Sequence, residues 1–304
     1  MIIIDNYSME IDKKILGMTT LVECSSTTYS YSSQGTGFFY AELEEEQDGL
    51  KKGPRWRKIL NVWLITNRHV AFPKTTLKNG VVIETVPDSL IFNMRESKNE
   101  KIEWVPIRLT KEELINRTKL HVDSQVDVVA IKIDDLQTQL VVKNKDRSFI
   151  GGAYLTNEDL PSLEQPIIEA TSDVVICSYP YAFYDKVNKF PIIKSGIVAS
   201  SWGADFNGSP HFLVDAKLFP GSSGGLVLSK PTNIAMINGQ LHYAKNKQYM
   251  LLGIYSGEYS HNTIDSKGQR HSESFGLGIV WYSSLIPKIT QNGIPIFSKL
   301  KLLI

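Results

Sequence analysis

Apolar residues along this chain gather in short runs that alternate with turn residues, and few runs keep the spacing of an amphipathic helix. The runs are rich in Val, Ile, Tyr and Phe, a composition typical of β-strands. The predicted strands cover residues 19–24, 35–43, 59–66, 90–94, 127–133, 173–180, 192–200, 211–216, 224–229, 248–256 and 275–281. Only 111–119 and 283–291 have a helical pattern, and Pro287 limits the second. Many short strands in a chain of this size predict an all-β protein, either a sandwich or barrels.

Composition narrows the classes of function. The 304 residues are 42% hydrophobic and 21% charged, which is ordinary for a globular protein with a large core. The net charge of +1 gives no electrostatic case for a nucleic-acid or membrane partner. The N-terminal residues lack the basic start and apolar run of a secretory signal, so we expect a cytoplasmic protein. No Gly-rich phosphate loop leads from a strand into a helix, which argues against a nucleotide-binding α/β fold.

The two cysteines and one charged segment allow structural predictions. Cys24 and Cys177 lie inside the apolar runs TTLVEC and DVVICSY, which predicts buried free thiols; a single disulfide between them stays open. Residues 42–58 carry acidic side chains on a first arm and basic ones on a second. This predicts a solvated hairpin whose exposed ion pairs contribute about 0–1 kcal/mol each. A calcium loop is the functional alternative, although the spacing matches no known cage.

The stretch LFPGSSGGLVLSK, residues 218–230, places two serines among three glycines. A flexible turn before a strand is the simplest interpretation. The alternative is a nucleophilic serine, which needs a base to remove its proton and a third group to hold that base. His69 follows the apolar strand ILNVWLIT, and Asp127 heads the strand DVVAIKI. Taken alone, each is more typical of a packed or capping residue.

The combination changes this interpretation. The order His, Asp, Ser, with His and Asp at strand edges, is one of the few orders in which the catalytic triad recurs. At these positions the sequence resembles the chymotrypsin-like (trypsin-like) serine peptidases, in particular the bacterial HtrA-like branch. The motifs that carry the resemblance are GTGFF (35–39), TNRHVA (66–71), DVVAIKI (127–133) and PGSSGGLV (220–227), with weaker matches at IKSGIVAS (193–200) and GLGIVWYSSLI (276–286). The resemblance covers roughly residues 19–290.

The resemblance implies two six-stranded antiparallel β-barrels with the active site in the cleft between them. Residues 1–145 would form the N-terminal barrel with His69 and Asp127. Residues 146–290 would form the C-terminal barrel with Ser223, and 291–304 a C-terminal tail. All three parts would make one protease unit.

The family roles fall on the matching positions of this chain. Ser223 would be the nucleophile because it precedes the Gly-Gly pair, and His69 would be the general base and then the general acid. Asp127 would orient the imidazole. The backbone N–H groups of Gly221 and Ser223 would form the oxyanion hole, and the side chain of Ser222 should point elsewhere.

Two departures from the family pattern matter. Digestive members have an aspartate at the position of Ser222, and after cleavage it pairs with a new N-terminus. This chain lacks that aspartate, the Ile-Val-Gly-Gly start and the cysteine after the histidine. We therefore expect neither activation by N-terminal cleavage nor disulfide stapling. HtrA proteins also carry a PDZ domain after the protease; only GIPIFSKLKLLI follows the last motif here, so none is expected.

The family binds its peptide as an added antiparallel strand. The resemblance therefore places Tyr255, Ser256 and Gly257 along the peptide and Gly278 in the pocket wall. Without the family context, an ordinary strand with a bulge at the glycine explains the same residues. Lys217 would lie at the pocket floor, which suggests a preference for Asp or Glu before the cleaved bond. We favour the alternative, in which Lys217 extends to solvent from a differently shaped loop.

These residues together favour a serine endopeptidase that cleaves protein or peptide substrates through an acyl-enzyme and needs no cofactor or metal. The first alternative is an inactive protease-fold module that binds peptides or partners, and a resting enzyme with a collapsed oxyanion loop is intermediate. The second alternative is a protease switched on by a regulatory protein that docks on the tail or the charged hairpin. No nucleic-acid or membrane partner is expected.

Overall fold

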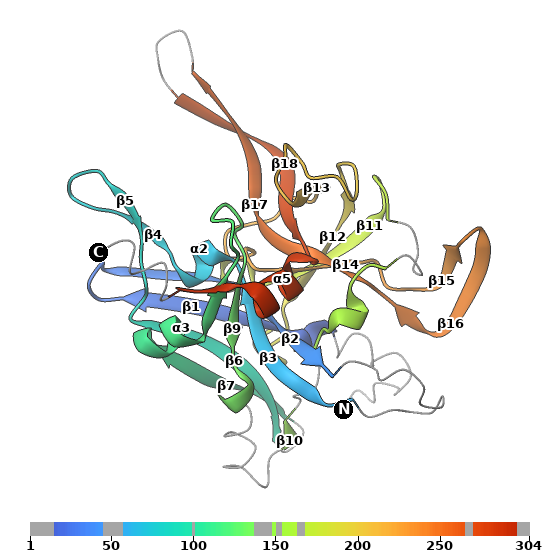
Figure 1. The fold of residues 1–304 in the computed structure, drawn as a ribbon, viewed down its shortest axis with the longest axis horizontal. Coiled ribbons are helices and arrows are strands. Elements are labelled where there is room, and N and C mark those ends of the chain that lie inside the picture. Colours follow the sequence, from blue (N-terminus) through green and yellow to red (C-terminus); the bar gives the residue numbers. More distant parts are fainter. Residues whose placement is uncertain are drawn as a thin grey trace.

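A computed structural model describes residues 15–44, 57–98, 101–136, 148–149, 154–162, 168–264 and 270–296. Strands dominate these segments, and the all-β prediction is confirmed. Figure 1 shows a large sheet beside a barrel, from which the paired strands β17 (Leu251–Ile264) and β18 (Arg270–Tyr282) extend outward as a long hairpin. None of the helices in the described segments has the length and apolar character to cross a bilayer.

The N-terminal half, together with one short strand from near the C-terminal end, forms a nine-stranded sheet. Its strands are β1 (Thr19–Ser26), β2 (Tyr31–Leu43), β3 (Ile59–Thr66), β6 (Ser89–Lys98), β7 (Lys101–Thr110), β8 (Thr118–Leu120), β9 (Val129–Lys132), β10 (Ser148–Phe149) and β19 (Ile294–Pro295). They pair in the order β10-β6-β1-β2-β3-β9-β8-β19, with β7 also on β6. The resemblance implied a closed six-stranded barrel here. Among the described strands, no pairing joins the two ends of this sheet. The helix α3 (Lys111–Arg117) connects β7 to β8.

The C-terminal half closes into the six-stranded antiparallel barrel that was predicted. Its strands follow the order β11-β12-β13-β18-β17-β14, where β11 is Asp173–Ser178, β12 is Ile192–Val198, β13 is His211–Asp215 and β14 is Leu226–Ser229. The two segments with a helical pattern correspond to α3 and to α5 (Leu285–Asn292), so both helix predictions are confirmed. The predicted division into residues 1–145, 146–290 and 291–304 stays a prediction.

Two hairpins lie outside both units. They are β4–β5 (Lys74–Thr76 and Val82–Glu84) and β15–β16 (Thr232–Ile237 and Gln240–Gln248). The sequence pattern did not predict β15–β16. Its apolar side chains Ile234, Met236, Leu241 and Tyr243 are all more than half exposed, so they do not mark a core face.

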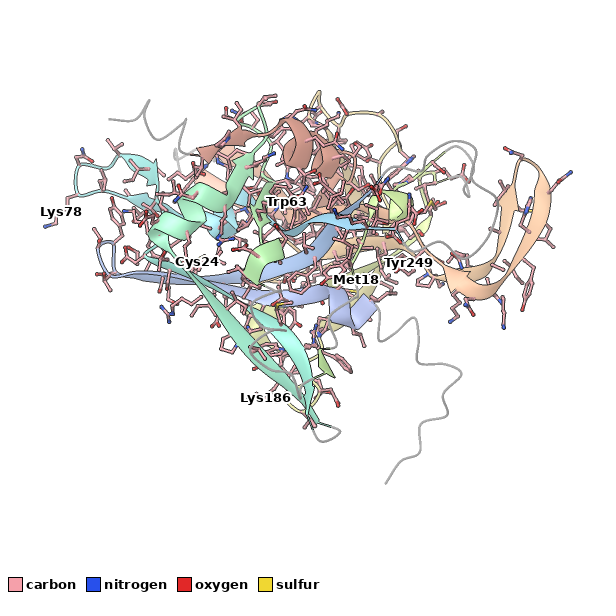
Figure 2. The ribbon with its side chains drawn as sticks, turned by 60° about the horizontal axis from the view of Figure 1, so that its bottom comes forward. Met18, Cys24, Trp63, Lys78, Lys186 and Tyr249 are labelled. Carbon is pink, nitrogen blue, oxygen red and sulfur yellow. The ribbon has the colours of Figure 1, made fainter. Side chains whose placement is uncertain are left out.

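A shared apolar core joins the sheet to the barrel. It contains Met18, Phe38 and Trp63 from the N-terminal half together with Leu226 and Trp281 from the barrel. Figure 2 shows Met18 and Trp63 in the interior and Lys78 at the outer end of the β4–β5 hairpin. Each fully buried large apolar side chain contributes about 1.5–3 kcal/mol. This core holds the two halves in a fixed relation, which the site between them needs.

Both cysteines are buried free thiols, as predicted. Cys24 lies in β1 and Cys177 in β11, and burial raises the pKa of each thiol to about 12. We expect no reaction of the folded protein with Ellman's reagent at pH 8, because the thiolate is the reactive form. Adding denaturant should release two reactive thiols per chain. Fast reaction of either thiol in buffer alone contradicts this expectation.

The charged hairpin and the C-terminal tail are only partly described. Residues 45–56 and 297–304 lie outside the described residues. At the base of the hairpin, the strands β2 and β3 pair antiparallel, and the Glu44 N–H donates to the Lys58 carbonyl at 2.9 Å. Arg57 on the second arm pairs with Glu158, outside the hairpin, and not with the acidic arm. The ion pairing of the other arm residues and the calcium alternative stay predictions.

Candidate active site

Strand pairing brings His69 and Asp127 together. In the antiparallel pair β3–β9, Thr66 at the end of β3 lies opposite Val129 at the start of β9. His69 follows Thr66 in the short helix α2 (Arg68–Ala71), and Asp127 precedes Val129. His69 Nδ1 lies 2.6 Å from Asp127 Oδ2, and the His69 backbone N–H donates to Asp127 Oδ1 at 2.9 Å. Both carboxylate oxygens of Asp127 therefore face this one residue.

Further bonds hold α2 in place. The Asn67 side chain and the Arg68 backbone N–H both donate to the Asp127 carbonyl, at 2.7 and 3.3 Å. The Arg68 guanidinium also forms two parallel bonds to Glu84 on β5, of 2.6 and 2.5 Å. Such fork-shaped pairs fix geometry better than single contacts. The short helix that carries the His69 imidazole is thus held by Asp127 and by Glu84.

Ser223 lies in the loop between β13 and β14, and this loop is fastened to both halves of the molecule. The Thr36 N–H of β2 donates to the Ser223 carbonyl at 2.7 Å, and the Gly224 N–H donates to the Tyr255 carbonyl at 2.8 Å. The neighbouring Ser222 is fully buried, and its hydroxyl accepts a bond from Ser178 at 3.2 Å. The two serines of PGSSGG therefore differ: Ser222 faces the interior, whereas Ser223 is partly exposed.

The backbone around Gly221 leaves two amides available. The Pro220 carbonyl accepts the Tyr181 N–H at 2.7 Å. All peptide bonds in the described structure are trans, so the N–H of Gly221 points away from that carbonyl. Within the described residues, neither the Gly221 N–H nor the Ser223 N–H donates a hydrogen bond to another backbone carbonyl. Gly221 has φ +90°, and a Cβ there would lie 2.7 Å from the Tyr179 carbonyl oxygen, so only glycine fits.

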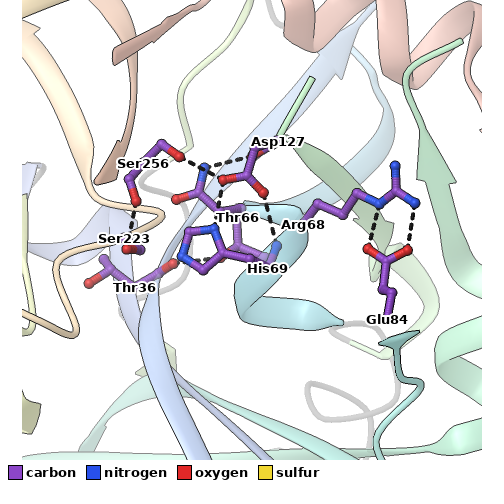
Figure 3. Close-up of polar contacts among 9 residues, drawn as sticks. Thr36, Thr66, Arg68, His69, Glu84, Asp127, Ser223 and Ser256 are labelled. Atoms are coloured by element: carbon purple, nitrogen blue, oxygen red, sulfur yellow. Dashed lines mark hydrogen bonds and ion pairs between the residues drawn. The ribbon is translucent and has the colours of Figure 1, made fainter. Parts of the chain in front are cut away.

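Ser256 links the three predicted catalytic residues. The Ser223 hydroxyl donates to the Ser256 carbonyl at 2.7 Å, and the Ser256 hydroxyl donates to Asp127 Oδ2 at 2.6 Å. Figure 3 shows this connection from Ser223 through Ser256 to Asp127 and on to His69. Within the described structure, the Ser223 hydroxyl is thus bonded to a carbonyl and not to the imidazole.

The residues predicted to contact substrate occupy different environments. A Cβ on Gly257 would meet nothing within 4 Å, whereas one on Gly278 would lie 2.6 Å from the Tyr255 ring. Tyr255 is 3% exposed, and its ring belongs to the barrel core. Lys217 is exposed, and its carbonyl accepts a bond from the Lys194 ammonium. The substrate contacts and the preference for an acidic side chain stay predictions.

The sequence did not predict two contacts of the candidate site. Ser256 was expected beside the peptide, and its bond to Asp127 was not foreseen. Thr36 received no role, yet its hydroxyl donates to the Gly221 carbonyl at 2.9 Å and accepts the Tyr179 N–H at 2.9 Å. The hydroxyl within GTGFF was the available signal. The bonds it makes join segments more than a hundred residues apart, and periodicity carries no information about such contacts.

Comparison with known proteins gives the class to which this arrangement belongs. The model of a family described as trypsin-like peptidase domain matches residues 35–233. That range includes His69, Asp127 and Ser223, and it covers more than half of the chain. The chain therefore belongs to the trypsin-like peptidase domain family.

Solved structures give a weaker likeness. The chain is similar to the crystal structure of the Rv3671c protease from M. tuberculosis in its active form, with 14% sequence identity and a TM-score of 0.41. That similarity covers 92% of this chain and 82% of the other. No curated protein matches the sequence.

Proposed function

We propose that this protein is a serine endopeptidase that uses Ser223, His69 and Asp127 as a catalytic triad. The observation that carries the proposal is the contact of Asp127 with both the ring Nδ1 and the backbone N–H of His69. With Nδ1 protonated toward the carboxylate, Nε2 carries the lone pair that a general base needs. The family match supports a peptidase, and the site geometry supports this mechanism.

The reaction follows from the groups present. After rotation of its side chain, Ser223 gives its hydroxyl proton to His69 Nε2 while Oγ bonds to the scissile carbonyl carbon. The carbonyl oxygen becomes an oxyanion, which the N–H groups of Gly221 and Ser223 bind. His69 then passes its proton to the leaving amine as the C–N bond breaks. A water molecule attacks the acyl-enzyme by the same steps and releases the carboxylic acid and free Ser223.

A fluorophosphonate probe tests this proposal because it bonds only to an activated serine. We expect covalent labelling of the native protein and none of Ser223→Ala. Ser222→Ala is the matched control: it removes the neighbouring, buried hydroxyl, which bonds to Ser178, and labelling should persist. The extent of labelling is measured by intact-protein mass.

The same assay distinguishes the alternatives. If Ser223→Ala is labelled, or if labelling is lost only in Ser222→Ala, the assignment of Ser223 as the nucleophile is wrong. If the native protein is labelled only after cell lysate is added, a regulatory partner switches the site on. If it is labelled under neither condition, the proposed catalysis is wrong, and the result favours an inactive protease-fold module that binds peptides or partners.

A further inference from the structure

The segment next to Gly221 has an unusual backbone. Tyr181 has φ 51° and ψ 31°, and Ala182 has φ 50°, so two consecutive residues with side chains lie in the left-handed region. Each such residue costs about 1–3 kcal/mol and persists only where its surroundings over-determine it. The Tyr181 N–H donates to the Pro220 carbonyl at 2.7 Å. This strained turn therefore fixes the orientation of the peptide bond that presents the Gly221 N–H.

Tyr179 anchors the strained turn. Its backbone N–H donates to the Thr36 hydroxyl at 2.9 Å. Its ring is fully buried and makes edge contacts with Trp104 and Tyr184, with centroids 5.9 Å apart in both pairs. Its hydroxyl receives a 2.5 Å bond from Arg95 Nη2. Burial raises the pKa of Tyr179 to about 12, so this hydroxyl is protonated at neutral pH.

Arg95 is a buried cation on β6 that has carbonyl partners. It is 4% exposed. Besides the Tyr179 hydroxyl, its guanidinium donates to the carbonyls of Gly17 at 3.2 Å, Thr19 at 2.9 Å and Lys189 at 2.7 Å. No carboxylate pairs with it among the described ion pairs.

A buried charge of this kind is costly, and a well-packed apolar side chain is often as stabilising or more so. Stability alone therefore gives a weak account of Arg95. The guanidinium instead fixes positions. Its hydrogen bonds hold the Thr19 carbonyl at the start of β1, the Tyr179 hydroxyl and the Lys189 carbonyl around one side chain. Between Tyr179 and Lys189 lies the turn that fixes the Pro220 carbonyl.

We propose that Arg95 and Tyr179 are positioning residues that keep the oxyanion loop in its anion-binding shape before substrate arrives. They hold the turn at residues 179–182 against the loop, so the Pro220 carbonyl stays on the Tyr181 N–H and the Gly221 N–H stays turned toward the reacting carbonyl. The inference rests on the proposed function, and it assigns a role to residues of the N-terminal sheet and the barrel that do not touch substrate.

The test compares Tyr179→Phe with the native protein. Hydrolysis of p-nitrophenyl acetate reports acyl transfer without a specificity pocket, and phenylboronic acid reports affinity for a tetrahedral adduct. Loss of a whole oxyanion donor lowers kcat by about 10²–10³-fold. In Tyr179→Phe the donor is displaced but still present, so we expect kcat to fall by about 10-fold, as small misplacements of reacting groups do. KM should change less than about twofold, and boronate affinity should fall by the same factor as kcat.

Tyr282→Phe is the matched control. Its hydroxyl accepts the Gly203 N–H and donates to the Ala204 carbonyl, both at 3.0 Å, so the same atom is lost away from the site. We expect a similar decrease in the thermal midpoint, with kcat and boronate affinity within about twofold of the native values. Arg95→Met should reproduce Tyr179→Phe. If Arg95→Met does not fold, Tyr179→Phe decides.

The possible results separate the two proposals. If the native protein neither hydrolyses the ester nor binds the boronate, with or without added cell lysate, the proposed function is wrong and the positioning role with it. If it is active only with lysate, the loop is not held in its anion-binding shape by these two residues, and only the positioning role is wrong. If the native protein is active and Tyr179→Phe keeps its kcat and boronate affinity, only the positioning role is wrong. A lower thermal midpoint in Tyr179→Phe with unchanged boronate affinity also overturns it, since the hydroxyl then serves stability alone.

Discussion

Replacing Asp127 with asparagine is expected to lower kcat by about 10⁴-fold while the fold is retained, the size of loss that follows when the histidine of a triad takes the wrong tautomer. The substitution keeps the shape of the side chain and exchanges one acceptor oxygen for a donor NH₂ group. Two contacts decide where that NH₂ group goes. The His69 backbone N–H donates to Oδ1 at 2.9 Å, so an NH₂ group there would place donor against donor.

The amide nitrogen must therefore occupy the position of Oδ2, which lies 2.6 Å from His69 Nδ1. A donor at that position requires Nδ1 to accept, so the proton moves to Nε2. Nε2 then has no lone pair with which to take the proton of Ser223. The Ser256 hydroxyl, which donates to Oδ2 at 2.6 Å, can rotate and accept instead, so the mutant amide is satisfied and the loss falls on catalysis.

Ester hydrolysis and the rate of fluorophosphonate labelling measure this loss, and circular dichroism checks the fold. Asp123→Asn is the matched control, because Asp123 lies in the same exposed loop and its carboxylate caps the Gln125 N–H at 2.9 Å. It should keep kcat within about twofold, as exposed substitutions away from a site do. An Asp127→Asn protein within tenfold of the native rate contradicts the triad.

The residues of the proposed triad could be selected from the sequence because each one lies beside a recognisable strand. His69 and Asp127 flank β3 and β9, and antiparallel pairing of those strands brings their ends together. The β3 prediction, 59–66, agrees with the observed strand. Ser223 was identified through the glycines beside it, whose backbone geometry only glycine tolerates.

What the sequence could not supply is contact between distant segments. The Ser256–Asp127 bond and the Thr36–Gly221 bond each join a strand of one half of the molecule to a loop of the other half, and no local pattern encodes either one. The same holds for Arg95: a charged residue within a strand predicts an exposed face, yet its side chain is buried among carbonyls. The position of the Ser223 hydroxyl on the Ser256 carbonyl is a rotamer state, which a residue type does not determine.

Replacing Gly224 with alanine is expected to destabilise the protein by about 3 kcal/mol or more, since it combines an unfavourable backbone with overpacking. Gly224 has φ +83°, and a Cβ there would lie 1.8 Å from the Thr36 carbonyl oxygen and 2.5 Å from the Thr66 hydroxyl. The first contact is with backbone, so no side-chain rotation relieves it. Either β2 or the loop between β13 and β14 must move. Ser223 lies in that loop, and its carbonyl accepts the Thr36 N–H of β2, so either movement displaces it.

Gly203→Ala separates the cost of the left-handed backbone from the cost of overpacking. Gly203 has nearly the same backbone, with φ +78°, but a Cβ there would meet nothing within 4 Å, so its loss should be only the about 1–2 kcal/mol of a left-handed residue. Urea unfolding measures both variants. Ester hydrolysis should fall about 100-fold for Gly224→Ala, because a displacement of about 1 Å in a reacting group costs that much, and it should stay near native for Gly203→Ala. Equal unfolding midpoints in the two variants would mean that β2 yields to the added methyl group without strain, and that the close approach of Gly224 to Thr36 does not hold the nucleophile in place.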